Sequence, residues 1–434
     1  MRRLAVLALA LAAACSEISQ VESGPTRTFY RPTGIGVYAG ALLVASSNSD
    51  LRYDGETGGS VIAVDASGPL ADGPVRAPWL GGFNIRSFAG ELAVADPAVC
   101  PALGGEALAL VPVRGSDHLY RVKLGAGGAP SCDGCELSLR GTQFTDPFAV
   151  TVACAPGFAR AYVGWLRSVG GRAWLTQVDL TQPDPAADGA VQHSDRAGTG
   201  QLRAFAFDPG RKRLWAAKSA TAGSTNLRWY DLAGGCRIDV DEFSGGCRGG
   251  AAALPDGLDP QGIALANGDP TRMYVAVRIF DARAAAVSGV RVGDVDGLLL
   301  VVNLVDDLAG QTHLQIEKQI SIGYGASAVR VLPPRAGNRR DVVAALAADD
   351  GVLWLYDDDT DALVAVGRDA FGHALVGVQP FGLAVDPTVR AGVVRVHVGS
   401  WAESFVTAYD VNLDDIDASL PPDPDLPHIL GGTP

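Results

Sequence analysis

The segments QPFGLAVDP (residues 379–387), VRVHVG (394–399) and FVTAYD (405–410) follow one another closely near the end of the chain. Each is short, rich in β-branched and aromatic residues, and bounded by Gly, Pro, Asp or polar residues. This pattern is typical of consecutive β-strands joined by turns, and the apolar residues show no helical spacing. The three segments therefore predict a small sheet.

The same unit recurs along the chain. It has a Pro-x-Gly-like start, an apolar first strand, a second strand such as Met273-Tyr274-Val275-Ala276, a polar loop, and a third strand that ends in Val-Asp or Tyr-Asp. The second copy is looser, with residues 91–95 as its second strand, and the sixth is degenerate at its start. Seven copies occupy residues 32–65, 91–113, 146–180, 204–232, 259–304, 328–357 and 379–410.

A repeat of roughly 55–60 residues is typical of a propeller blade with long loops. Such strands cannot bury a core alone, but stacked radially they cover both faces and leave only short edges. We predict an all-β fold, a seven-bladed β-propeller with mainly four-stranded antiparallel blades, over residues 28–418. The unit resembles the YVTN, NHL and gluconolactonase-like propeller repeats over most of the chain, a resemblance that implies a fold more than an activity.

The N-terminus is typical of an exported protein. Arg2 and Arg3 precede an apolar run and three alanines, so residues 1–14 are predicted to be a signal peptide. The stretch that ends at Cys15 resembles a bacterial lipobox, although Ala12 stands where Leu is usual. This resemblance implies acylation of Cys15; ordinary cleavage after Ala14 is the alternative. Residues 15–27 would form the lipidated tether. We expect an outer-membrane lipoprotein, with membrane contact through the anchor only.

The net charge indicates which classes of partner the protein can bind, and the composition of the C-terminal tail indicates its conformation. The net charge is −13, no Lys/Arg-rich run offsets it, and such a surface repels phosphate backbones, so nucleic-acid binding is not expected. Residues 419–434 are a proline-rich tail that we expect to be extended. We expect a monomer.

Six cysteines remain beyond Cys15, and an even number in an exported chain predicts disulfides. Cys236 and Cys247 flank one polar loop and are the expected pair. The pairing of the other four stays open. A redox or zinc role for the CxxC pair is disfavoured because glycines and a proline surround it, without a helix or a second CxxC. These four cysteines are Cys100, Cys132, Cys135 and Cys154.

A propeller places the equivalent loops of its blades around a central axis. The repeat therefore predicts which residues lie together on one rim and could bind a ligand. Residues directly after each second strand are polar or aromatic, which suits ligand contact, although solvated loops are polar anyway. The longest of these loops, residues 278–296, adds further charged residues. The candidates are Asn48, Asp50, Asp96, Trp165, Arg167, Lys218, Arg278, Asp281, Arg283, Asp349, Asp350, Trp401 and Glu403.

Catalytic signatures are not found. The sequence has no Gly-x-Ser-x-Gly, His-Glu-x-x-His or Walker motif, and no cofactor is expected. Calcium could bind carboxylates at Asp294 and Asp296, or at Asp357 and Asp359, but the EF-hand spacing is missing and turn roles suit Asp equally.

We therefore predict a non-enzymatic binding scaffold for a protein, peptide or glycan. The alternative is a metal-dependent hydrolase or lactonase of the gluconolactonase-like class. That resemblance implies a glutamate on an early inner strand, and the repeat pattern places none there.

Overall fold

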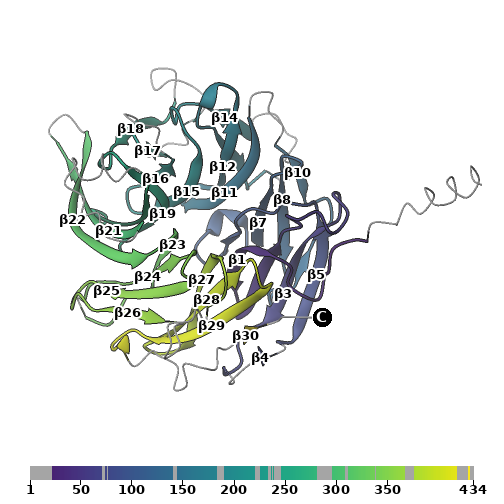
Figure 1. The fold of residues 1–434 in the computed structure, drawn as a ribbon. Coiled ribbons are helices and arrows are strands. Elements are labelled where there is room, and N and C mark those ends of the chain that lie inside the picture. The colour runs from purple at the N-terminus through teal and green to yellow at the C-terminus, as the bar shows by residue number, and fades with distance from the viewer. Residues whose placement is uncertain are drawn as a thin grey trace, which may run out of the picture.

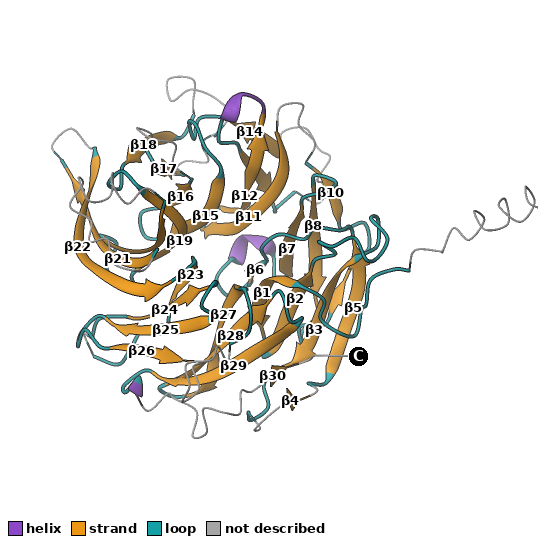
Figure 2. Cartoon of the chain, viewed as in Figure 1, coloured by secondary structure: helices purple, strands orange, loops and turns teal. Residues whose placement is uncertain are grey.

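The computed structural model consists of seven antiparallel sheets that follow one another along the chain as blades of a ring (Figure 1). Strands form almost all of its regular structure, and short 3-10 helices, among them Pro101–Leu103 and Val169–Gly171, lie in loops (Figure 2). The all-β, seven-bladed prediction is confirmed. The structure describes residues 22–70, 74–75, 77–139, 144–182, 190–219, 225–232, 236, 238, 246–280, 296–307, 311–337, 339–366, 376–417 and 429–430.

Each blade begins at its innermost strand and continues outward in sequence order. Two blades have an additional short strand: β9 (Pro130–Ser131) pairs with β8 in blade 2, and β4 joins blade 7. From the inside outward, the strands are β1 (Pro32–Tyr38), β2 (Ala41–Ser46), β3 (Gly59–Asp65) and β5 (Trp79–Ile85) in blade 1; β6 (Ala93–Ala95), β7 (Ala107–Val113), β8 (His118–Leu124) and β10 (Glu136–Ser138) in blade 2; β11 (Phe144–Ala155), β12 (Phe158–Ser168), β13 (Leu175–Asp179) and β14 (Val191–Ser194) in blade 3; β15 (Leu202–Asp208), β16 (Arg213–Lys218), β17 (Leu227–Asp231) and β18 (Arg248–Ala252) in blade 4; β19 (Leu258–Leu265), β20 (Arg272–Ile279), β21 (Gly297–Asp306) and β22 (Thr312–Gly323) in blade 5; β23 (Ala326–Val331), β24 (Val342–Ala347), β25 (Val352–Asp357) and β26 (Leu363–Val366) in blade 6; and β27 (Pro380–Arg390), β28 (Val393–Ser400), β29 (Phe405–Asn412), β30 (Ile429–Leu430) and β4 (Pro74–Val75) in blade 7.

The hydrophobic core is divided among the junctions between blades. Seven clusters of buried apolar side chains each draw on two neighbouring blades. Second strands are buried on both faces, which is why β2 and β24 are continuous apolar runs without polar alternation. One cluster joins Ile62 of blade 1 to Val406 of blade 7. The ring is therefore closed by packing at every junction.

Polar contacts also tie blade 7 to blade 1. Arg395 on β28 is 2% exposed and donates hydrogen bonds to the carbonyl oxygens of Ala66 (2.6 Å) and Gly68 (2.7 Å), which follow β3. Its guanidinium also pairs with the carboxylate of Asp410 on β29 at 2.7 Å. At the outer edge of blade 7, β30 pairs with β29, and β4 from the β3–β5 connection pairs with β30 in parallel. Blade 7 thus contains strands from three separate parts of the chain.

Three disulfides connect the six cysteines. Cys236–Cys247 is present as predicted. Cys100–Cys154 joins the β6–β7 loop of blade 2 to β11 of blade 3, and Cys132–Cys135 closes a turn within blade 2. The pairing that the sequence left open is therefore one bond between blades and one within a blade.

The ring has two faces that differ in the loops they carry. We call "upper" the face with the loops from second to third strands and with the connections from each blade to the next inner strand. The lower face carries the loops from first to second and from third to fourth strands. Antiparallel order fixes this division, because successive strands of a blade reverse direction.

Candidate binding face

In every blade the chain has one extra residue near the upper face, within the inner strand or, in blade 2, shortly before it. In six blades the ladder between the first and second strands shifts register there, for example between Pro32 and Gly34 in blade 1. In blade 2 the same shift falls between the Ala89–Val113 bridge and the Ala93–Leu110 pair. An extra residue of this kind is a β-bulge, a feature that re-aims a side chain and is common beside binding sites.

These bulges form a ring around the axis, which we call the bulge ring. Neighbouring members contact one another: the amide of Glu91 donates to the carbonyl oxygen of Phe148 at 3.0 Å, and Arg203 donates to the Gln261 side chain at 3.0 Å. All members are partly buried except Phe381, which is 40% exposed. The bulge ring consists of Thr33, Glu91, Phe148, Arg203, Gln261, Ser327 and Phe381.

Glu91 is the acidic member of the bulge ring. Its carboxylate accepts a hydrogen bond from the amide of Val150 at 3.3 Å. Burial raises the pKa of Glu91 to about 7, against the positive charge of Arg330 from blade 6, which acts to lower it. Protein surrounds this carboxyl closely although the side chain keeps some exposure. Glu91 therefore changes charge near neutral pH.

Replacing Glu91 with glutamine is expected to change how stability depends on pH. Between pH 4.5 and about 7, the folded protein holds the Glu91 proton that the unfolded chain has released, so the wild-type free energy of unfolding falls as pH rises. The loss across this window is up to about 3 kcal/mol. Glutamine carries no such proton, so Glu91→Gln should gain stability relative to the wild type as pH rises. Urea unfolding at pH 4.5, 6 and 7.5 measures the difference, and parallel curves would contradict it.

The bulge ring was not predicted from the repeat, although the Pro-x-Gly motif of the repeat marks three of its members. The x of the Pro-x-Gly start is the bulged residue in three blades: Thr33, Gln261 and Phe381. Blade 2 lacks that motif, which hid Glu91. Because β6 is the innermost strand and not the second, Asp96 follows a first strand and lies on the lower face, where its carboxylate accepts the amide of Ala98. This corrects the assignment of Asp96 to the rim.

Several predicted rim residues are at the upper face but turned inward. Asn48 is fully buried and orders its loop by bonding Tyr53 and Ser87. Trp165 is buried and donates to the hydroxyl of Thr176 at 2.8 Å. Lys218 is also buried. Asn48 follows its second strand, whereas Trp165 and Lys218 lie within theirs, and none of the three is exposed for contact with a partner.

Other rim residues stay accessible and pair with neighbours. Asp50 accepts the hydroxyl of Tyr30 at 2.5 Å and pairs with Arg31, whose guanidinium lies 4.5 Å from the centre of the Trp401 ring. Arg167 pairs with Asp146 at 3.0 Å, and Arg278 lies 4.0 Å from Asp349. Asp350 and Glu403 accept the amides of Tyr324 and Val378. Asp281 and Arg283 lie outside the described residues.

Exposed apolar side chains gather on the upper face. Of the eight large ones exposed in the described residues, five lie there and three, Trp79, Val99 and Val305, lie elsewhere. The five belong to blades 5, 6, 7 and 1, which are consecutive around the ring, and they are 40–59% exposed. We call them the apolar arc: Phe280, Tyr324, Val378, Phe381 and Leu51.

The described candidate metal ligands form ion pairs or hydrogen bonds with other groups of the protein. Asp357 and Asp359, on the lower face, pair with Arg335 at 2.8 and 3.3 Å, and Asp296 accepts the amide of Gly325. Asp294 lies outside the described residues. Within the described ranges, no group of three or more His, Cys, Asp or Glu is placed to hold a metal ion.

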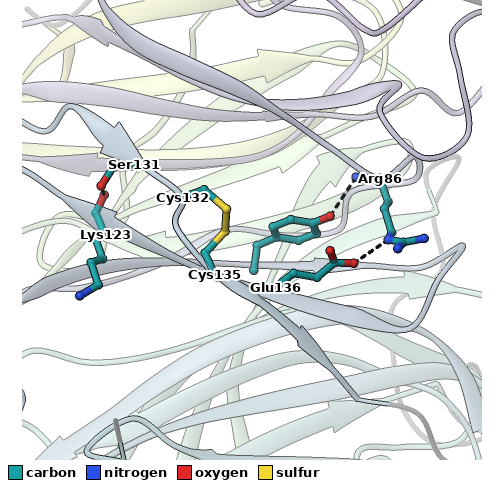
Figure 3. The surroundings of a disulfide bond; sticks show 7 residues. Arg86, Lys123, Ser131, Cys132, Cys135 and Glu136 are labelled. Atoms are coloured by element: carbon teal, nitrogen blue, oxygen red, sulfur yellow. Dashed lines mark hydrogen bonds and ion pairs between the residues drawn. A yellow bond between two sulfur atoms is a disulfide. The ribbon is translucent and has the colours of Figure 1, made fainter. Parts of the chain in front are cut away.

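The CxxC turn lies at the outer edge of blade 2. Both β9 and β10 pair with β8, and the four residues between them project from that edge with Cys132 exposed and Cys135 buried (Figure 3). Beside the turn, on the lower side, a pocket of about 360 Å³ extends toward blade 3 and is lined by Glu106, Arg121 and Lys123 among others. The disulfide thus fixes a projecting turn.

No family model matches the chain. No curated protein matches it in sequence either. Solved structures share its general shape at 11–12% identity: the nidogen/laminin complex (TM-score 0.41; 75% of this chain and 96% of that one), the RRP9 WD40 repeats (0.48; 88% and 92%) and Sqt1 from Chaetomium thermophilum (0.48; 94% and 90%). The propeller assignment depends on the sheet topology described above. In the described part of the chain, no helix has the length and apolar character needed to cross a membrane.

Proposed function

We propose that this protein is an exported propeller that binds a protein or peptide through its upper face. The observation that carries the proposal is the apolar arc, because large apolar side chains exposed together mark interaction sites more often than isolated ones do. Its member Phe381 also belongs to the bulge ring, so the two features meet at this residue.

The polar surroundings of the arc support the proposal. Arg31 stacks over Trp401 beside Leu51. The carboxylate of Asp350 accepts a hydrogen bond from the amide of Tyr324, and the amide of Asp349 donates to the Tyr324 carbonyl oxygen. Aromatic residues and arginine supply much of the binding energy in protein interfaces, with polar groups at the rim. A glycan would use the same aromatic and polar groups, and the experiment below separates the two ligand classes.

Panning of a displayed random-peptide library against the folded protein tests the proposal. Selected peptides should lose at least about tenfold in affinity for Phe280→Ser/Phe381→Ser, since each truncation removes a central anchor. A glycan array probed in parallel would identify a sugar ligand instead. The readout is the dissociation constant by titration calorimetry.

The matched control is Val99→Ser/Val305→Ser, which replaces two apolar residues that are more exposed than Phe280 and Phe381 as a pair and lie away from the upper face. Peptide affinity should be unchanged in this variant. Equal losses in both variants, or no peptide and no glycan that binds, would contradict the proposal.

Glu91 is the one observation that favours the second candidate, a metal-dependent hydrolase or lactonase. It is a glutamate two residues before the inner strand β6, close to where the gluconolactonase-like resemblance implies one. Against this candidate, the positive charge of Arg330 acts on Glu91. Metal analysis of the purified protein distinguishes the two functions: one bound ion per chain, lost in Glu91→Gln, would favour the hydrolase.

Membrane anchoring through Cys15 is the other part of the proposal. Cys15 lies outside the described residues; the three disulfides agree with an oxidising compartment. Cys15→Ser is expected to move the protein from the detergent phase to the aqueous phase in Triton X-114 partitioning. The reason is that each CH₂ group of an acyl chain contributes about 0.8 kcal/mol to the free energy of binding to a membrane or micelle. A wild-type protein found in the aqueous phase would rule the anchor out.

A further inference from the structure

Two cationic side chains of blade 4 face the connection between blades 3 and 4. Lys218 is the last residue of β16, and Arg228 lies on β17 opposite Ala216. Because side chains alternate along a strand, Lys218, Ala216 and Arg228 share the face of blade 4 that packs on blade 3. Nζ of Lys218 donates to the carbonyl oxygen of Thr199 at 2.8 Å, and Nε of Arg228 donates to that of Ala197 at 3.3 Å.

The two cations converge on one small space beside Gly198. A Cβ atom added to Gly198 would lie 3.2 Å from Nζ of Lys218 and 3.4 Å from Nη2 of Arg228. Apart from residues 197–199 themselves, no other atom comes within 4 Å of that point. The φ of Gly198 is +88°, which favours glycine and keeps a side chain out of this space. Both cationic groups therefore approach Gly198 closely, and an oxyanion placed between them could contact both.

The pair carries two positive charges without a compensating carboxylate. Within the described part of the chain, the hydrogen bonds of both side chains go to backbone carbonyls, and the nearby Asp195 pairs with Arg172. Burial, together with the charge of Arg228, lowers the pKa of Lys218 to about 8. Lys218 is only 1% exposed, so water does little to offset the repulsion. Binding an anion would remove this cost.

A buried hydroxyl adds a donor near the same cations. Tyr230 lies two residues beyond Arg228 on β17, and its hydroxyl has no hydrogen-bond partner among the described residues. Burial raises the pKa of Tyr230 to about 12, while the charges of Arg228 and Arg196 act in the opposite direction. An un-ionised hydroxyl can donate a hydrogen bond to an oxyanion.

We propose that Lys218 and Arg228 form an oxyanion site between blades 3 and 4, which accepts a carboxylate, phosphate or sulfate group. Arginine and lysine are the side chains that bind such groups most strongly, through charge-assisted hydrogen bonds. The chain as a whole carries a charge of −13, so the pair is a local exception to an acidic molecule. The inference is independent of the proposed binding at the apolar arc.

Calorimetric titration of the folded full chain with phosphate, sulfate and acetate, at fixed ionic strength, tests the site. At least one anion should bind saturably to the wild type. Lys218→Met and Arg228→Met should each weaken it by about tenfold or more, as expected for loss of a charge-assisted hydrogen bond. Lys218→Arg keeps the charge and should keep most of the affinity. Lys123→Met, at an exposed lysine of blade 2, should bind like the wild type.

The pH dependence of anion affinity is a second measurement. It would not change between the wild type and Lys218→Arg if Lys218 had only a structural role. Sulfate stays fully charged, so its affinity for the wild type should rise from pH 9 to pH 7 as Lys218 becomes protonated. Lys218→Arg should abolish this rise because arginine stays charged. No saturable binding of any of the three anions to the wild type, or equal binding by the two methionine variants with unchanged circular dichroism, would overturn the proposal.

Discussion

Replacing Arg395 with methionine is expected to lower the free energy of unfolding by about 3–5 kcal/mol. Arg395 is buried between blades 7 and 1, where its guanidinium donates hydrogen bonds to the carboxylate of Asp410 and to the carbonyl oxygens of Ala66 and Gly68. Methionine fills a similar volume but leaves a carboxylate without its partner and two carbonyls without a donor. Urea unfolding followed by tryptophan fluorescence measures the change.

An exposed arginine provides the comparison for this substitution. Arg172 pairs with Asp195 but its side chain is 62% exposed, so Arg172→Met should cost no more than about 0.5 kcal/mol. A second comparison, Asp410→Asn, keeps the shape and should show part of the Arg395 effect. If Arg395→Met were as stable as Arg172→Met, the polar contacts would not contribute to closing the ring.

Removing the disulfide between blades 2 and 3 should also have a large effect. Cys100 and Cys154 are 54 residues apart, and releasing a loop of that size costs about 4 kcal/mol by the chain-entropy relation. The Cys132–Cys135 bond spans only 3 residues, so its removal should cost about 2 kcal/mol or less. The Cys100→Ser/Cys154→Ser variant is therefore expected to have the lower urea midpoint.

The two disulfide variants serve as controls for each other, since each loses two sulfur atoms: one from blade 2 and one from blade 3 in Cys100→Ser/Cys154→Ser, and both from blade 2 in Cys132→Ser/Cys135→Ser. The prediction concerns the difference between them, measured under identical reversible conditions. Equal losses, or a larger loss for Cys132→Ser/Cys135→Ser, would show that local contacts of the CxxC turn matter more than the size of the loop.

The fold was predictable because its signals are local. Turn residues end each strand, and the final aspartate of a third strand reappears as the partner of an arginine on the second: Asp231 with Arg213 and Asp410 with Arg395. Such short-range patterns recur in several blades and survive variation in loop length. Blade 2 was misread at one strand because a three-residue inner strand without Pro-x-Gly resembles a second strand.

The candidate site was less predictable because it depends on side-chain direction and on neighbours from other blades. Asn48, Trp165 and Lys218 lie in or just after the upper ends of second strands, close to where the repeat placed them, yet each turns inward. The convergence of Lys218 and Arg228 on Gly198 joins positions 20 to 30 residues apart through the packing of two blades. No spacing rule in the sequence expresses that geometry.

The bulge ring also bears on how a scaffold of this kind could acquire new ligands. A bulged residue stands outside the regular pairing between two strands, so exchanging it leaves the neighbouring ladder bonds in place. Seven such positions, one per blade, lie around the axis near the upper face, and among these described residues only Phe148 packs against a core cluster between blades. Selection, in nature or from a library randomised at these seven codons, could thus alter specificity while the architecture stays unchanged.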